Sequence, residues 1–108
     1  MEPVRFLRIA KALADPRRLE ILELLSASGE ITCGDVVDGI SVGQSTVSHH
    51  LRILVDSGLV SVRRSGQHAL YRVRRGSLEG YLTMLRRRLQ PSGAHRGHLG
   101  NVEPETAS

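Results

Sequence analysis

The chain has few of the residues on which many protein classes depend. Its only cysteine is Cys33, so an intramolecular disulfide is excluded and a reducing compartment is indicated. Aromatic residues make up 3% of the 108 residues, which disfavours a stacking platform for single-stranded nucleic acid. No apolar run approaches the ~20 residues that span a membrane, and the start shows no signal-peptide pattern. These absences predict one small soluble, cytoplasmic domain with no membrane partner.

The groupings that enzymes use are also missing. Serine, histidine and aspartate do not follow one another in an order that suggests a catalytic triad, and no glycine-rich loop is arranged to hold a phosphate. The acids are scattered surface residues rather than catalytic pairs. We therefore predict that the protein is not an enzyme.

Positive charge is present in excess and is concentrated in one part of the chain. The formal net charge is +4. Residues 1–51 carry five basic side chains against seven acidic ones, residues 52–88 carry nine arginines against two acids, and the remainder carries one against two; the three parts contribute −2, +7 and −1. All basic residues except Lys11 are arginine, whose planar fork suits phosphate and guanine. We expect part of the basic segment to face DNA, although the Arg86-Arg87-Arg88 run can equally be a solvated face.

Apolar spacing and capping residues predict three helices before the basic segment. Residues 4–14 suit a helix that is apolar on more than one side. Asp15 and Pro16 mark the start of a helix that runs to about residue 27, because the carboxylate accepts free N–H groups and proline needs no partner. Thr32 caps a third, short helix over 33–39, after a segment long enough for only one small strand.

The segment from Gln44 to Val73 carries the clearest functional signal. The helix expected over 44–57 is polar on one side and apolar on the other, and Gly58 ends it. Two strands expected over 59–64 and 68–73 form a basic hairpin around a Ser-Gly turn. A helix that can enter a major groove, beside a ribbon that can straddle phosphates, is typical of a double-stranded DNA reader. The predicted contacts are Ser45, Thr46, Ser48, His49 and Arg52 on the helix, and Arg63 and Arg64 on the hairpin.

A last helix is expected over 78–90, with Ser77 as its cap and Pro91 after its end. Its five large apolar side chains share one face, and their full burial would contribute roughly 7–15 kcal/mol in gross terms. Because a small domain cannot leave such a stripe in water, we predict a twofold homodimer in which the two terminal helices of each subunit pack on those of the other. The alternative is that both helices fold back on their own core. The predicted dimer contacts are Leu7, Leu78, Tyr81, Leu82, Leu85 and Leu89.

The order of elements defines the predicted fold class. Helix, helix, short strand, helix, helix, hairpin, helix is mainly α with a small β-hairpin wing (α+β). It is a winged helix-turn-helix with N- and C-terminal dimerisation helices. We expect residues 1–90 to form this DNA-binding and dimerisation domain. Residues 91–108 are rich in small, polar and charged residues and are predicted to be a disordered tail.

Five stretches of the chain resemble the ArsR/SmtB family of bacterial repressors. They are ALADPRRLEILELL (Ala12 to Leu25), QSTVSHHLRIL (Gln44 to Leu54), SGLV (Ser57 to Val60), RRSGQ (Arg63 to Gln67) and LYRV (Leu70 to Val73). The resemblance covers roughly residues 6–90, in order and without obvious insertions. It implies a homodimeric repressor with its two recognition helices in successive major grooves, ~34 Å apart, of a near-twofold operator. Such repressors generally leave DNA when an inducer, often a metal ion, binds.

The resemblance also assigns individual positions. The exposed face of the recognition helix matches Gln44, Ser45, Thr46, Ser48 and His49; its inward face matches Val47, His50 and Leu51; and the wing matches Arg63, Arg64 and Gln67. Arg52 can reach either a phosphate or a base. On this register His50 is expected to pack or hydrogen-bond internally rather than act as a ligand beside His49. Two departures concern the turn: Gly43 replaces the usual serine cap, and Ser41 stands where a glycine is expected.

The metal sites of the family are incomplete in this sequence. One uses Cys-x-Cys at the start of the third helix, and the matching positions are Thr32 and Gly34, with Cys33 between them. The other needs histidines on the last helix, which has none. Cys33, His95 and His98 remain as weak candidates for a transition metal such as nickel or zinc. The alternative without a metal is that Cys33 is a small buried residue at a helix start and that His95 and His98 belong to a solvated tail.

These observations leave the signal open. The first hypothesis is a DNA-binding repressor gated by a metal, by redox change, by an organic effector or by a companion protein. The alternative is a winged helix that contacts another protein through its basic face.

Overall fold

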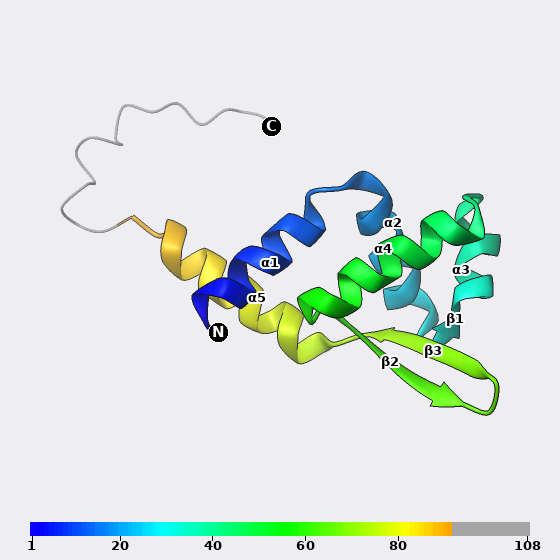
Figure 1. The fold of residues 1–108 in the computed structure, drawn as a ribbon. Coiled ribbons are helices and arrows are strands. Elements are labelled where there is room, and N and C mark those ends of the chain that lie inside the picture. The colour runs from blue at the N-terminus through cyan, green and yellow to red at the C-terminus, as the bar shows by residue number, and fades with distance from the viewer. Residues whose placement is uncertain (92–108) are drawn as a thin grey trace.

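The computed structural model describes residues 1–91 and shows a helical body from which a β-hairpin projects (Figure 1). The order of elements agrees with the prediction. The elements are α1 (Pro3–Leu13), α2 (Pro16–Ser28), β1 (Ile31–Thr32), α3 (Cys33–Ile40), α4 (Gln44–Ser57), β2 (Val60–Ser65), β3 (His68–Val73) and α5 (Arg75–Leu89). The predicted tail from 92 onward, with His95 and His98, lies outside the described residues, so those predictions stay predictions.

The starts of α2 and α3 follow from side chains that accept free backbone N–H groups. The Asp15 carboxylate accepts from the N–H of Arg17 at 2.8 Å and of Arg18 at 3.2 Å, and Pro16 occupies the first helical position. The Arg18 N–H bond, together with that of Arg17, holds the pKa of Asp15 below its ordinary value. Thr32 and Asp35 form a capping box, in which each side chain accepts from the backbone N–H of the other residue.

The core of the domain is built around α4. Val47, Leu51 and Leu54 on this helix are fully buried, and α4 contacts α1, α2, α3 and β2. The facing side chains are also apolar and buried; they include Ile9 of α1, Ile21 and Leu25 of α2, Val36 of α3 and Val60 of β2. Because the apolar side of α4 is buried against four other elements, the orientation of the helix is fixed and its polar side faces solvent.

Three antiparallel strands form the sheet, in the order β1-β3-β2. Val60 pairs with Val73 at the base of the hairpin, and Ser65 pairs with His68 at its tip. The two-residue loop between them has Gly66 at φ +62°, whereas Gln67 has a negative φ, which is the pattern of a type II′ turn. The short β1 adds a third strand along β3, from Ile31 opposite Tyr71. The wing is therefore anchored on one side by the segment that joins α2 to α3.

The last helix begins earlier than the sequence predicted. Ser77 was expected to cap it, but α5 starts at Arg75 and Ser77 lies buried in the first turn. The reason is a contact between distant parts of the chain: Nη2 of Arg5 donates to the Ser77 hydroxyl at 2.9 Å, so this oxygen is used by α1. Arg74, in the cap position, makes no side-chain capping bond.

The terminal helices α1 and α5 lie side by side (Figure 1). Tyr81 is 8% exposed and its ring stacks on Phe6 of the same chain, with centroids 5.0 Å apart. The guanidinium carbon of Arg88 lies over the Phe6 ring, 5.2 Å from its centroid, in a cation–π contact. Little of Tyr81 is left for a partner subunit, whereas Leu7, Leu82 and Leu89 stay exposed. The intrachain alternative therefore accounts for part of the apolar stripe and not for the rest.

The lengths and compositions of the helices bear on membrane association. Over the described residues 1–91, none of the helices combines the length and the apolar character needed to cross a bilayer.

Candidate nucleic-acid interface

The solvent-facing side of α4 carries the polar residues that the sequence singled out. All six predicted helix contacts are exposed: Gln44, Ser45, Thr46, Ser48, His49 and Arg52. Ser45, His49 and Arg52 are spaced four and three residues apart and so follow one face of the helix. This face combines hydroxyl, amide, imidazole and guanidinium groups, which together can donate to and accept from base edges in a major groove.

The start of α4 is bare of side-chain caps. Gly43 occupies the cap position without a capping bond, and nothing lies within 4 Å of the point where a Cβ would stand. The N–H groups of Gln44, Ser45 and Thr46 find no acceptor among the described residues, since the first helical bond runs from Val47 to Gly43. Free N–H groups and the positive end of the helix dipole therefore lie at the same end of α4 as its first polar side chains, an arrangement that suits a phosphate.

The turn before α4 contains a strained residue. Ser41 adopts a left-handed conformation with φ 65° and ψ 39° and ends α3. The family pattern has a glycine at this place, and the backbone here shows why: only glycine takes this conformation without steric cost. Serine in place of glycine at position 41 therefore raises the free energy of the turn and leaves its backbone geometry intact.

His50 faces inward, as predicted. Its Nδ1 lies 3.3 Å from Nη1 of Arg18, whose Nε also donates to the backbone oxygen of Ala12 at 2.7 Å. Because an arginine can only donate, Nδ1 of His50 acts as the acceptor and the ring is neutral in this contact. Burial, reinforced by nearby arginines, lowers the pKa of His50. Arg18 thus links α1, α2 and the inner side of the recognition helix.

The wing residues differ in whether another side chain already binds them. Arg64 and Gln67 are exposed near the tip of the hairpin. Arg63, by contrast, forms a two-pronged ion pair with Glu30, with Nε–Oε2 2.7 Å and Nη2–Oε1 3.0 Å. This hydrogen-bonded pair holds the pKa of Glu30 below its ordinary value. Sequence reasoning missed Glu30 because the two residues are 33 positions apart and meet only when β1 joins the sheet.

The described residues do not provide a family metal site. Residues 1–91 contain no group of three or more histidine, cysteine or acidic side chains placed to hold a metal ion. Thr32 and Asp35 are occupied in the capping box, and Cys33 stands between them as a single half-buried thiol. Burial raises the pKa of Cys33, so the thiolate that a soft metal requires is disfavoured. The donor set in this part of the chain does not fit a metal ion.

A rigidly seated helix with a polar outer face, preceded by a short turn and a third helix and followed by a β-hairpin, defines the winged helix-turn-helix class of DNA-binding proteins. The comparison with known proteins narrows this class. Residues 15–62 match the family model described as bacterial regulatory protein, arsR family. This chain belongs to the ArsR family of bacterial transcriptional regulators.

Three relatives illustrate the match. An arsenical resistance operon repressor from Staphylococcus xylosus is 45% identical over 60% of this chain and 62% of its own length, and one from Staphylococcus aureus is 39% identical over 71% and 73%. The matched stretch thus spans a little under two thirds of the first of these relatives. A possible ArsR-family regulator from Mycobacterium bovis, solved as a homodimeric winged helix-turn-helix DNA-binding domain, has a TM-score of 0.66 at 29% identity, covering 81% of this chain and 82% of that one.

Proposed function

We propose that the protein is a homodimeric repressor that binds an operator in double-stranded DNA and is released from it by an inducer. The observation that carries the proposal is the exposed polar face of α4, held in place by complete burial of its other side and flanked by the basic wing. The S. xylosus and S. aureus relatives are operon repressors, which supports the same role here. The proposal places the protein in the cytoplasm, where bacterial DNA is found.

The residues divide into two kinds of contact. Ser48, His49 and Gln44 have the donors and acceptors needed to distinguish base pairs in a major groove. Arg64 and Gln67 at the hairpin tip are placed to meet the backbone beside that groove, where they would set position rather than sequence. Arg52 lies farther along the same helical face and can serve either purpose.

The dimer surface is the apolar side of α1 and α5 that the subunit does not cover. Leu7, Leu82 and Leu89 are exposed there, and Leu78 borders an apolar hollow of about 470 Å³ between α2 and α5. Exposed apolar side chains gathered on two adjacent helices are typical of a subunit interface. The homodimeric M. bovis relative supports this assignment. A twofold axis through these helices would present the two α4 helices to successive major grooves, ~34 Å apart.

The DNA-binding part is tested by equilibrium binding to the promoter region upstream of the protein's own gene and to a shuffled duplex of equal length. If the dimer neutralises about ten phosphates, log Kd against log salt should have a slope of magnitude near 9 for the wild type. Arg64→Gln should weaken binding to both duplexes and reduce that magnitude by about one per subunit, whereas Ser48→Ala should erode the difference between the duplexes. Arg87→Gln, which removes an arginine from the last turn of α5, is the matched control. A slope magnitude below about 3 would contradict the proposal, and equal affinity for all DNA would favour the protein-interaction alternative.

The interface is tested separately by sedimentation at micromolar protein concentration. Leu82→Glu with Leu89→Glu should convert the dimer to monomers and abolish tight operator binding, because two charges would be buried in an apolar contact. Val62→Glu, which replaces an equally exposed apolar residue on β2, should leave the dimer intact. A double variant that remains dimeric would show that the subunits meet elsewhere.

A further inference from the structure

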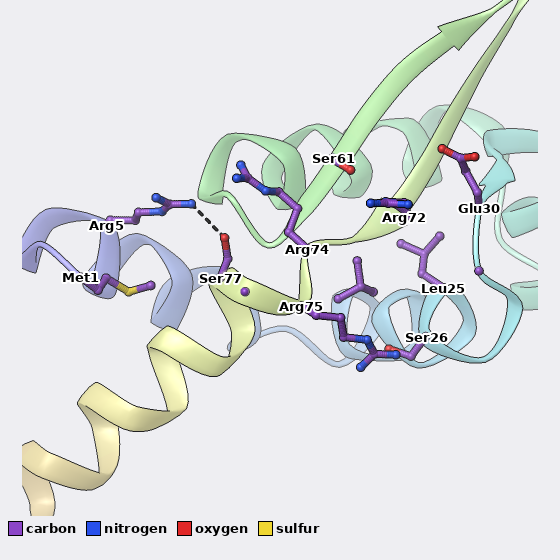
Figure 2. Close-up of a pocket in the computed structure, with 13 residues that line it drawn as sticks. Met1, Arg5, Leu25, Ser26, Glu30, Ser61, Arg72, Arg74, Arg75 and Ser77 are labelled. Carbon is purple, nitrogen blue, oxygen red and sulfur yellow. Dashed lines mark hydrogen bonds between the residues drawn. The ribbon is translucent and has the colours of Figure 1, made fainter.

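A basic cleft lies beside the start of α5 (Figure 2). None of the predicted DNA contacts lines it, although its lining residue Glu30 is the ion-pair partner of the predicted wing contact Arg63. It has a volume of about 980 Å³ and opens between the end of α2, the base of the hairpin and the first turn of α5. Four of its lining residues are arginines: Arg5, Arg72, Arg74 and Arg75. Its one acid is Glu30, which is already bound by Arg63. The cleft therefore carries a surplus of positive charge.

Within residues 1–91, three arginines of the cleft form no ion pair with a carboxylate. Among the described residues the ion pairs join Arg17 to Glu20, Arg18 to Asp15 and Arg63 to Glu30, and none involves Arg72, Arg74 or Arg75. Arg72 lies between Ser61 and Glu30 in Figure 2, close enough to influence the pKa of Glu30 without pairing with it. Unpaired guanidinium groups that line one cleft repel one another, and a bound anion stabilises them.

The first turn of α5 adds donors to the same cleft. The N–H groups of Ser77 and Leu78 both donate to the Arg74 oxygen, but those of Arg75 and Gly76 find no acceptor among the described residues. No side chain caps the helix, and its first turn contains no acid. At Gly76 nothing lies within 4 Å of the point where a Cβ would stand, so the space on that side of the residue is open. Positive side chains at the positive end of a helix dipole are unfavourable, and a bound anion would remove the conflict.

The position of the cleft argues against DNA as its occupant. The predicted base contacts cluster in the first half of α4, whereas Arg5 lies against Gly58, just after the opposite end. A 14-residue helix is about 20 Å long, so the Arg5 end of the cleft is separated from the groove-reading residues at the start of α4 by about that distance. In Figure 1 the start of α5 likewise lies at the far end of α4 from α3.

We infer that this cleft binds a small diffusible anion with a phosphate or carboxylate group, and that the anion controls the fit of the protein to its operator. Arg72, Arg74 and the free amides of Arg75 and Gly76 would hold the charged group. Arg5 supplies the coupling, because its guanidinium lines the cleft, donates to Ser77 on α5 and touches the end of α4 at Gly58. An anion that draws Arg5 away from Ser77 would loosen the junction between the recognition helix and the terminal helices. The regulatory role rests on the proposed function, whereas anion binding itself does not.

Binding is tested by ¹H–¹⁵N NMR of the full chain, titrated with inorganic phosphate against sodium chloride at matched ionic strength. The amides of Arg75 and Gly76 should shift saturably with phosphate and not with chloride. The double variant Arg72→Gln with Arg74→Gln should bind phosphate at least tenfold more weakly. Arg86→Gln with Arg87→Gln, which removes the same charge from the last turn of α5, should bind as the wild type does. No saturable shift by about 20 mM phosphate in the wild type, or an equal loss in both variants, would overturn the site, and the wild-type result stands even where a variant is unstable.

Control of DNA binding is tested with the same proteins. Phosphate at matched ionic strength should weaken operator binding by the wild type at least fivefold and leave the cleft variant, Arg72→Gln with Arg74→Gln, unaffected. Saturable phosphate binding with unchanged operator affinity would overturn the regulatory role. An operator that itself shifts the Arg75 and Gly76 amides, with the cleft variant weakened as much as Arg64→Gln, would show that the anion is DNA and overturn the inference. A wild type that binds phosphate but no operator would refute the proposed function and not the site.

Discussion

The helices α4 and α5 are almost equal in length but differ in how they are held. On α4, Leu51 and its apolar neighbours are completely buried, and the exposed side is polar. On α5, only Ser77 and Tyr81 are buried, while Leu82 and Leu89 are 40% and 73% exposed. The subunit thus completes the packing of its recognition helix by itself and leaves its last helix incomplete. The orientation of the polar side of α4 is a property of one chain, whereas in the proposed dimer the spacing of two such sides would depend on a second copy.

The largest effect is expected when one leucine on each of these helices is replaced by alanine. Leu51→Ala should destabilise the subunit by about 3 kcal/mol, because it leaves a cavity in a packed core. Leu82→Ala should change the stability of the isolated subunit by less than about 1 kcal/mol and instead raise the concentration at which the dimer dissociates. Urea unfolding at two protein concentrations measures both quantities. Equal, concentration-independent losses would mean that the two helices do not differ in this way.

A second test compares a glycine at the end of α4 with one inside α5. Gly58 has φ +91°, and a Cβ there would lie 2.8 Å from Nη2 of Arg5. Gly58→Ala should therefore destabilise by about 2 kcal/mol, combining left-handed strain with displacement of the arginine. In Gly80→Ala the new methyl meets only the flexible end of Met1 at 3.3 Å, so its better helix propensity should stabilise by about 0.5 kcal/mol. Thermal unfolding should show shifts of opposite sign; shifts of the same sign would refute the comparison.

The turn that leads into α4 allows a smaller gain. Ser41→Gly should stabilise by about 0.5 kcal/mol, since it relieves a left-handed serine at the end of α3. Gly43→Ser should add a few tenths of a kcal/mol by capping α4, because the backbone there is extended and the space is open. Denaturant unfolding of the two single variants and the double variant measures these effects. Destabilisation by Ser41→Gly would show that the hydroxyl has a role that the backbone does not reveal.

The smallest expected effect is a pH dependence that belongs to α4 and not to α5. The pKa of His50 is lowered in the folded protein, chiefly by burial, with Arg18, His49 and Arg17 acting in the same direction and Asp15 opposing them. The folded state therefore prefers the neutral ring, and its contribution to stability is present above the ordinary pKa of 6.5 and lost as pH falls below it. His50→Gln, which keeps an acceptor for Arg18, should flatten the stability profile between pH 7 and 5. Loss of the Asp15 contribution belongs to a lower range, below its ordinary pKa of 3.8 and toward its depressed value, so it should survive in the variant.

Local signals were enough to place most elements. The range 44–57 was predicted for the recognition helix and is the range observed, because both signals are local: its apolar spacing lies within the segment and Gly58 follows it directly. The Asp15-Pro16 start was predicted in the same way. The hairpin turn was predicted at Ser65-Gly66, but its two loop residues are Gly66 and Gln67, because Ser65 still pairs with His68 in the ladder. The DNA contacts on α4 follow from that register and stay predictions until binding is measured.

Contacts between distant residues could not be predicted. Ser77 has the side chain of a helix cap, but its hydroxyl accepts a hydrogen bond from Arg5, 72 positions away. The helix starts at Arg75, two residues before Ser77. Tyr81 belongs to an apolar stripe, but its stacking on Phe6 depends on how α1 and α5 meet. The basic cleft was missed for the same reason: Arg5, Arg72 and Arg75 are adjacent only in the folded chain.

The ion pair between Arg63 and Glu30 has a consequence for how the wing would recognise DNA. The Glu30 carboxylate binds the Arg63 guanidinium through two oxygens, in the geometry that a phosphate would use, and so competes with phosphate for that edge of the side chain. A backbone phosphate must displace this carboxylate before it can bind the same edge of the Arg63 guanidinium, whereas Arg64 forms no ion pair among the described residues. Stray encounters with DNA would therefore engage the wing only in part. Full engagement would be reserved for a duplex that α4 already holds long enough for one anion to replace the other.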